Sequence, residues 1–215
     1  MTYYRLSDIK TPPFAYVVNK DQAIRVCARC QMPFETLGQR LRVEICVPNS
    51  GTPASISGKP MMADHWMIGD SHFANLLAKN LPDQFHKAPI SVEAWMTGDA
   101  NEPDGFSLME NQTGRDLRDS VYFLFKPRGQ LGLDPTILQK FTPIKCTACL
   151  REVPEIPFDF QPIPFLEGEL PLVASLKGLC FEGFDYLFHK EVLDLVQRVF
   201  PEMMLEPLVL EPFAF

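Results

Sequence analysis

Residues 27–30 read Cys-Ala-Arg-Cys, and residues 146–149 read Cys-Thr-Ala-Cys. Two cysteines at this spacing point into one tight turn and can bind the same face of a metal ion. One such pair supplies half of the tetrahedral shell of a structural zinc site, so two pairs complete it. The sequence therefore predicts one structural Zn²⁺ that joins distant parts of the chain. The predicted ligands are Cys27, Cys30, Cys146 and Cys149.

Cysteine pairs at this spacing have two other interpretations. A redox pair normally has its first cysteine at the start of a helix that follows a strand, and Pro33 with the short runs near Cys27 does not fit that context. Free cysteines are also common in protein cores. Neither pair is followed by glycine, the residue that most readily adopts the left-handed turn of a metal-binding knuckle; Gln31 and Leu150 stand there instead. Structural zinc remains the favoured interpretation.

The two remaining cysteines have apolar neighbours. Cys46 lies within Val43–Val47, and Cys180 lies between Leu179 and Phe181. We expect both to be core residues and not metal ligands.

Composition and charge narrow the class of protein. The chain has 215 residues, enough for one sizeable domain or two small ones. Its net charge is -7 and it has no basic stripe, which argues against binding nucleic acid or an anionic membrane and favours a basic protein partner. The N-terminus does not resemble a signal peptide, and no apolar run is long enough for a membrane span. We therefore expect a cytoplasmic protein with reduced thiols.

Hydrophobic patterning predicts short strands and two amphipathic helices. One helix is expected over 70–80, with Asp70 or Ser71 as its cap, and the other over 189–199; both stop before a proline. A weaker helix is suggested at 135–140. The apolar tail, 203–215, is interpreted as a final strand on the core, or as an edge for a partner. The predicted strands cover 3–6, 16–18, 42–47, 90–95 and 121–125.

A shift of 119 positions (146 − 27 = 119) superimposes the two cysteine pairs. The same shift places Tyr3 on Tyr122, Leu76 on Leu195 and Pro82 on Pro201, although identity elsewhere is at background level. This pattern suggests two related halves. We expect a first half over 1–95, a connecting segment over 96–120 and a second half over 121–215, or else one compact domain.

No convincing active site is found in the sequence. His65, Asp70 and His72 could form a catalytic metal site, but no HExxH motif accompanies them, and a polar residue is expected at His72 in the first turn of a helix. Ser71 lacks the second glycine of a nucleophile elbow, and there is no phosphate-binding or dinucleotide-binding glycine motif. We therefore predict no catalytic and no cofactor-binding residues.

The chain resembles the double-CXXCG proteins, a paralogous bacterial family best populated in myxobacteria, and a related set of bacterial immunity proteins. The residues that carry this resemblance are CARC at 27–30, CTAC at 146–149 and GLCFEGFDYLFHKEVLDLVQRV at 178–199. The absent glycines after both pairs depart from the family pattern. The resemblance implies a zinc-containing α+β protein that binds and neutralises a cognate toxin.

The sequence thus predicts an α+β protein with mixed sheets, two short amphipathic helices and two pseudo-repeated halves joined by one four-cysteine zinc site. The predicted function is that of a non-catalytic binding protein, an immunity factor against a bacterial toxin. One alternative is a zinc-dependent enzyme that uses His65, Asp70 and His72 and carries a second metal ion. Another alternative is a zinc-ribbon module that binds nucleic acid.

Overall fold

The computed structural model describes residues 2–9, 14–29, 33–37, 39–48, 53–64, 66–98, 107–108, 121–131, 143–150, 152–154, 171–176 and 186–209. These residues form a seven-stranded sheet, a five-stranded sheet, two separate two-stranded ribbons and two ten-residue helices. The α+β class predicted from the sequence is confirmed.

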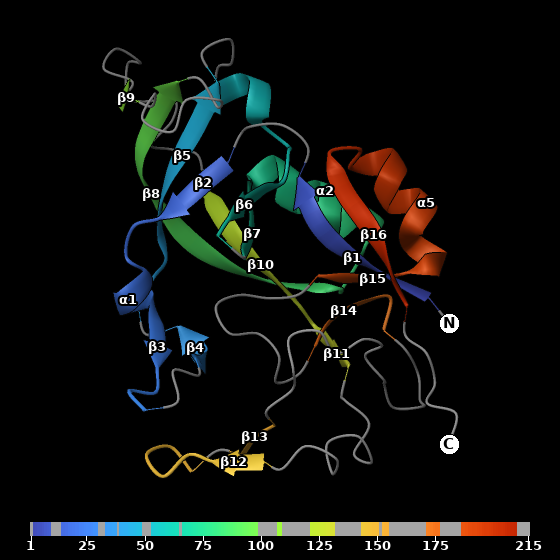
Figure 1. The fold of residues 1–215 in the computed structure, drawn as a ribbon. Coiled ribbons are helices and arrows are strands. Elements are labelled where there is room, and N and C mark those ends of the chain that lie inside the picture. Colours follow the sequence, from blue (N-terminus) through green and yellow to red (C-terminus); the bar gives the residue numbers. More distant parts are fainter. Residues whose placement is uncertain are drawn as a thin grey trace.

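Six strands of the seven-stranded sheet close into a barrel (Figure 1). Their order is β10-β7-β6-β2-β5-β8, and β10 also pairs with β8. The ring closes because β8 is long: its first part, 85–90, pairs with β10, and its second part, 91–98, pairs with β5. The bounds are β2 Phe14–Val17, β5 Arg42–Pro48, β6 Met61–Ala63, β7 Trp66–Asp70, β8 Phe85–Gly98 and β10 Tyr122–Pro127, with β9 Ser107–Leu108 paired to the end of β8.

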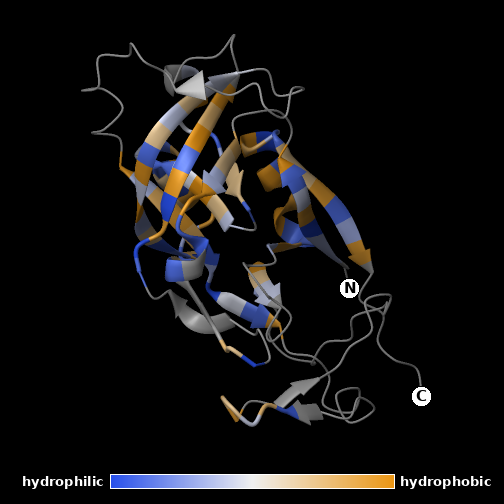
Figure 2. Ribbon diagram, turned by 60° about the vertical axis from the view of Figure 1, so that its left-hand side comes forward, coloured by the Kyte–Doolittle hydropathy of each residue, from blue (hydrophilic) through white to orange (hydrophobic). Residues whose placement is uncertain are grey.

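Alternate residues of the barrel strands fill its interior, and Figure 2 shows the alternation of hydrophobic and hydrophilic positions along the long strands. The strands β7 and β10 differ because each contributes side chains to a hydrophobic cluster on both of its faces. Trp66 and Ile68 belong to the interior cluster, whereas Met67 belongs to a second cluster outside the barrel. All five residues of β7 are buried, so 66–70 lacks the alternating pattern of a half-exposed strand and was not predicted as one.

The five-stranded sheet has the order β11-β14-β15-β1-β16. Strand β1, from the start of the chain, lies between β15 and β16, from the end of the chain, and pairs antiparallel with both. The bounds are β1 Thr2–Ile9, β11 Gly129–Leu131, β14 Val173–Leu176, β15 Leu187–His189 and β16 Met203–Val209. Strands from the two halves of the sequence are therefore mixed in both large sheets.

The helices α2, Ser71–Asn80, and α5, Lys190–Val199, lie where the sequence predicted them. The side chain of Asp70 caps α2 by accepting a 2.8 Å hydrogen bond from the backbone N–H of Phe73. Both helices contribute to the second hydrophobic cluster, which also takes in Phe125 and Phe188 from the strands beside them. The other helical segments are single turns, α1 Lys20–Ala23 and η1 Pro53–Ile56.

Two short ribbons lie apart from the large sheets, at the lower end of the molecule in Figure 1. One pairs β3, Ile24–Val26, with β4, Pro33–Leu37. The other pairs β12, Pro143–Lys145, with β13, Glu152–Pro154.

The predicted strands at 3–6, 42–47, 90–95 and 121–125 fall on β1, β5, β8 and β10, and the one at 16–18 overlaps β2. The tail begins with β16, which pairs with β1 as a final strand; residues 210–215 lie outside the described residues. The weak helix at 135–140 also lies outside them.

Candidate metal centre

In each ribbon, the first strand ends one residue before a predicted ligand. β3 ends at Val26, before Cys27, and β12 ends at Lys145, before Cys146. Strand pairing fixes the direction in which the chain leaves each strand, and the turns that follow the two strands bring Cys27 and Cys146 together. Cys27 and Cys146 are both buried although they are 119 residues apart.

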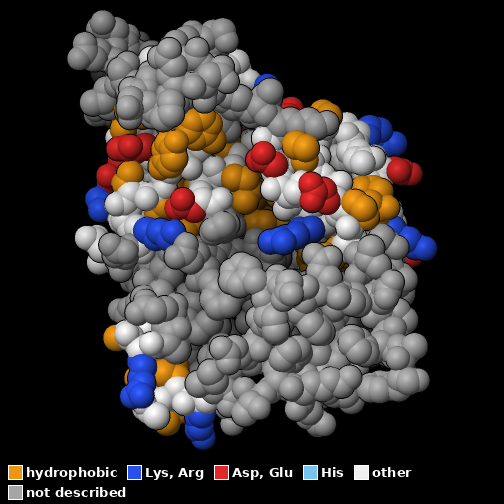
Figure 3. All heavy atoms as spheres, viewed as in Figure 1, with side chains coloured by type: hydrophobic (Ala, Val, Ile, Leu, Met, Phe, Trp, Pro, Cys, Tyr) orange, Lys and Arg blue, Asp and Glu red, His pale blue; other side chains and the backbone are white. Residues whose placement is uncertain are grey.

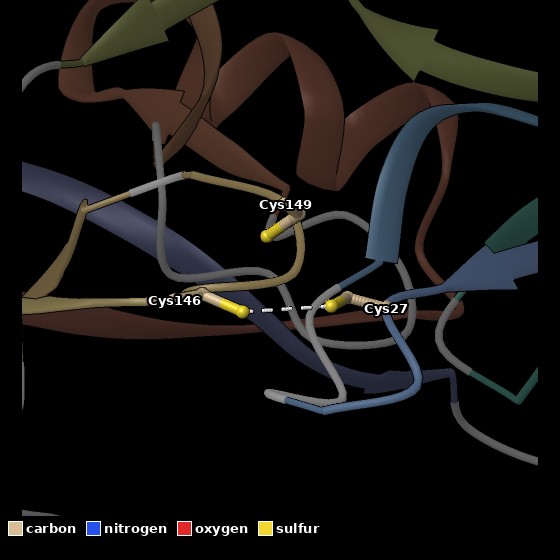
Figure 4. A group of neighbouring side chains, drawn as sticks. All are labelled: Cys27, Cys146 and Cys149. Carbon is tan, nitrogen blue, oxygen red and sulfur yellow. Dashed lines mark hydrogen bonds between the residues drawn. The ribbon is translucent and has the colours of Figure 1, made fainter.

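The sulfur atoms of Cys27 and Cys146 are 3.6 Å apart. Cys149 belongs to the same turn as Cys146, and the three sulfur atoms lie within 4.8 Å of one another. Figure 4 shows the three side chains converging on one point, with Cys149 approaching from beside the Cys27–Cys146 pair. The three cysteines therefore form a cluster that could hold a metal ion.

The sulfur separations fit a tetrahedral ion. With Zn–S bonds of about 2.3 Å, two ligands of a tetrahedral zinc ion have sulfur atoms about 3.8 Å apart. The 3.6 Å separation of Cys27 and Cys146 is close to that value. It is also far longer than the roughly 2.0 Å of a disulfide bond, so Cys27 and Cys146 are not joined by one.

The turn that carries Cys146 and Cys149 is closed by a hydrogen bond of 2.8 Å from the backbone N–H of Leu150 to the carbonyl oxygen of Cys146. Leu150 has a φ of 61°, in the left-handed region where glycine is normally found. The missing glycine therefore does not prevent the knuckle, but a side chain at this φ costs about 1–2 kcal/mol. The sequence alone could not indicate that Leu150 tolerates this conformation.

Of the four predicted ligands, the structure brings together Cys27, Cys146 and Cys149, and Cys30 lies outside the described residues. The four-cysteine site is thus seen only as this three-cysteine cluster. Cys46 is buried in the barrel wall on β5, and burial, with a smaller effect of the Glu44 carboxylate, raises the pKa of its thiol to about 11. Cys46 is therefore a neutral core residue. Cys180 lies outside the described residues.

The histidine-containing alternative has one member, His65, outside the described residues. The carboxylate of Asp70 is occupied by structural contacts: besides capping α2, it accepts hydrogen bonds from the Ser57 hydroxyl, at 2.6 Å, and from the backbone N–H of Gly58. His72 is exposed on the first turn of α2, beside Gly58. Asp70 thus connects the residues that follow η1 to the start of α2 through hydrogen bonds.

The chain matches no protein-family model, no curated protein and no solved structure. In the described part of the chain, no helix has both the length and the apolar character needed to cross a membrane.

Proposed function

We propose that Cys27, Cys30, Cys146 and Cys149 bind one structural Zn²⁺, and that the chain is a non-catalytic binding protein that neutralises a bacterial toxin by direct contact. The observation that carries the metal site is the convergence of Cys27, Cys146 and Cys149 within 4.8 Å. Cys30 completes the set because it stands three positions after Cys27, as Cys149 stands after Cys146.

The surroundings of the cysteines support a structural role for the metal ion. A tetrahedral shell of four thiolates leaves no open position for a substrate or a reactive water molecule. Such a group carries a net charge of roughly −2, which nearby cations stabilise. Arg29 and Lys145, which flank the cysteines in sequence, are exposed. Figure 3 shows Lys and Arg side chains at the lower end of the molecule, where the two ribbons lie.

The proposed toxin-binding role rests on the resemblance of the CxxC pairs and of residues 178–199 to bacterial immunity proteins. The net charge of -7 supports a basic partner, because opposite charges speed the encounter. Among the described residues, the three cysteines are the one group of His, Cys, Asp and Glu side chains gathered closely enough for a metal ion.

The metal site is tested by elemental analysis of the purified protein and of single Cys→Ser variants. We expect one zinc per chain, and at least about tenfold weaker zinc binding after substitution of any of the four ligands. Cys46→Ser is the matched control, because Cys46 is buried but lies outside the cluster. Full zinc retention in Cys146→Ser would overturn the site, and two zinc ions per chain would favour the enzyme alternative.

The binding role is tested with the product of the neighbouring gene. We expect that gene to encode a toxin, that the two purified proteins form a stable complex, and that co-expression restores growth. A neighbouring metabolic enzyme that neither binds the chain nor inhibits growth alone would refute the role.

A further inference from the structure

We infer that the chain consists of two structurally equivalent units, related by a shift of 119 residues, that exchange their first strands around a twofold axis through the cysteine cluster. The equivalent elements are β1, β3, β4, β7, α2 and β8 in the first unit and β10, β12, β13, β15, α5 and β16 in the second, whereas β14 corresponds to the η1 region and not to a strand. The statements about bound metal rest on the proposed function, whereas the equivalence of the units rests on the backbone.

The helices correspond residue for residue. α2 covers 71–80 and α5 covers 190–199, which is the same interval after a shift of 119. Their ends also match: Leu81 N–H donates to the carbonyl oxygen of Leu77 at 2.8 Å, and Phe200 N–H donates to that of Val196 at 2.7 Å. The two C-cap residues have nearly the same backbone angles, φ -131° and ψ 63° at Leu81, φ -128° and ψ 66° at Phe200.

The strands beside the helices correspond as well, but across the units. In the barrel, Tyr122 of β10 lies opposite Asp70, the cap of α2. In the five-stranded sheet, Tyr3 of β1 lies opposite His189, the cap of α5. Each first strand therefore pairs at the same register with the helix-preceding strand of the other unit. This reciprocal pairing is a strand exchange.

The strands after the helices correspond with a shift of 118. Phe123 lies opposite Pro89 in the barrel, and the equivalent Tyr4 lies opposite Pro207 in the five-stranded sheet. The one-residue difference arises in the turn after the helix, which spans 81–84 in the first unit and 200–202 in the second. A single deletion in this turn accounts for it.

The ribbons repeat the same relation. β3 covers 24–26 and β12 covers 143–145, and the pair Val26↔Pro33 corresponds to the pair Lys145↔Glu152. Helix bounds, strand registers and ribbon registers are set by independent hydrogen bonds. Apart from the one-residue difference after the helix, they agree on a shift of 119, which is not expected by chance in a chain whose halves share so few identical residues.

Equivalent residues also touch one another, which locates the axis. Cys27 and Cys146 are equivalent, and their sulfur atoms are 3.6 Å apart. Met67 and Tyr186 are equivalent, and the Met67 N–H lies 2.7 Å from the Tyr186 hydroxyl oxygen. A residue can meet its own equivalent only near the symmetry axis. The axis therefore runs from the cysteine cluster (Figure 4) into the second hydrophobic cluster, to which both helices contribute.

The metal site is accordingly a site between units. Each unit supplies one CxxC pair, and Cys30 is the equivalent of Cys149, a member of the observed cluster. Neither unit alone completes its sheet or the ligand set. The chain corresponds to a twofold homodimer whose two copies have become one polypeptide.

One pair of positions shows how the two units diverged. In the first unit, a Cβ on Gly69 would lie 2.3 Å from the ring of Phe73, so a small residue must stand opposite the large one. In the second unit the sizes are reversed: Phe188 and Val192 occupy the equivalent positions, and both are buried in the same cluster. The sizes of the two residues are complementary in each unit.

The test exchanges residues 69–80 with residues 188–199 in the full chain. Gly69 then moves together with Phe73, and Phe188 moves together with Val192. We expect one cooperative thermal transition, lowered by about 5–15 °C. The control places residues 187–198 at positions 69–80 and residues 68–79 at positions 188–199, so each inserted segment is one position out of register. The control should lose its cooperative transition. Loss of the transition in both chains, or equal retention in both, would overturn the equivalence.

A second test uses only the second unit. Val192→Phe should collide with Phe188, and Phe188→Gly should leave a cavity. The double variant recreates the Gly69 and Phe73 arrangement, so it should melt at a higher temperature than either single variant. A double variant that melts below both singles would contradict equivalence. Neither test depends on zinc: a chain without metal that tolerates the exchange would refute the metal site and keep the two-unit architecture.

Discussion

The backbone N–H of Met67 donates a hydrogen bond of 2.7 Å to the hydroxyl oxygen of Tyr186, 119 residues further along the chain. The same hydroxyl donates to the carbonyl oxygen of Phe125 at 2.8 Å. Met67 and Phe125 are facing partners in β7 and β10, so the hydroxyl bridges the two strands of the barrel wall. The barrel thus depends on a buried side chain from the second unit.

Removing this hydroxyl should be costly. Tyr186→Phe leaves the Met67 N–H and the Phe125 carbonyl without this partner in a buried site, and we expect the free energy of unfolding to fall by about 2–4 kcal/mol. Urea denaturation measures it. Tyr16→Phe is the control, because the Tyr16 side chain is 51% exposed, and it should change stability by less than about 0.5 kcal/mol. Equal effects of the two variants would contradict the bridging role.

Removing the backbone strain at Leu150 should raise the affinity for zinc. Leu150 has a φ of 61° and is 69% exposed, so glycine would remove steric strain while losing little buried apolar area. We expect Leu150→Gly to tighten zinc binding about 2–5-fold, equivalent to about 0.5–1 kcal/mol, in competition with a chromophoric chelator. Leu150→Ala keeps the Cβ and should bind zinc as the native chain does. Weaker binding by the glycine variant than by the alanine variant would disprove the explanation.

The cap of α2 should contribute more than an ordinary helix cap. Asp70→Ala removes the acceptor of three groups, the Phe73 N–H, the Gly58 N–H and the Ser57 hydroxyl. We expect a loss of about 2–3 kcal/mol in urea denaturation, above the roughly 1 kcal/mol typical of a cap. Asp70→Asn keeps an acceptor oxygen and should lose less than half as much. If Asp70→Ala lowers the free energy of unfolding by only the roughly 1 kcal/mol of an ordinary cap, the hydrogen bonds to Ser57 and Gly58 contribute nothing.

The helices and the cysteine cluster are the parts of the structure that could be predicted from the sequence. The helices were predicted because Phe73 and Leu77, like Val192 and Val196, recur at helical spacing and are buried. The convergence of cysteines was predicted because a thiolate pair needs a second pair to complete a zinc shell. Both signals are local in sequence or follow from metal chemistry.

Barrel closure and strand exchange could not be predicted in this way. Periodicity reports whether one face of a strand is buried, and it says nothing about which strand lies beside it. Tyr3 and Tyr122 were recognised as equivalent, but nothing local indicates that each pairs with the other half. The strand β7 was missed because both of its faces are buried, which leaves no alternation to detect.

Alkaline pH should weaken the fold through Tyr3. Burial raises the pKa of Tyr3 from 10.0 to about 12, so above pH 10 the unfolded chain releases this proton before the folded chain does. The contribution of protonated Tyr3 is complete below pH 10 and is lost as the pH rises through about 12. Tyr3→Phe should be about 1 kcal/mol less stable at pH 8, because the hydrogen bond to the Pro171 carbonyl oxygen is lost, and this deficit should shrink by pH 12.

Urea denaturation at each pH measures the deficit. Tyr122→Phe provides a second case, since burial and the Asp70 carboxylate raise the pKa of Tyr122 as well. A deficit that stays constant or grows between pH 8 and pH 12 in both variants would exclude this cause.

Removal of the metal should open the ribbons and leave the sheets intact. The ribbons pair only within themselves among the described strands, and neither Cys27 nor Cys146 belongs to a hydrophobic cluster. Zinc at about 100 times its dissociation constant stabilises the closed ribbons by about 2.7 kcal/mol. A strong chelator should therefore speed amide hydrogen exchange in the ribbons, as at Lys145, by about 100-fold. Exchange at Ile45 and Leu124 in the barrel should change far less, because those amides open with the core. The control variant Cys46→Ser, treated with the same chelator, should show the same difference in exchange rate between the ribbons and the barrel. An equal rise in the exchange rates of Lys145, Ile45 and Leu124 would mean that the metal ion holds the whole fold together.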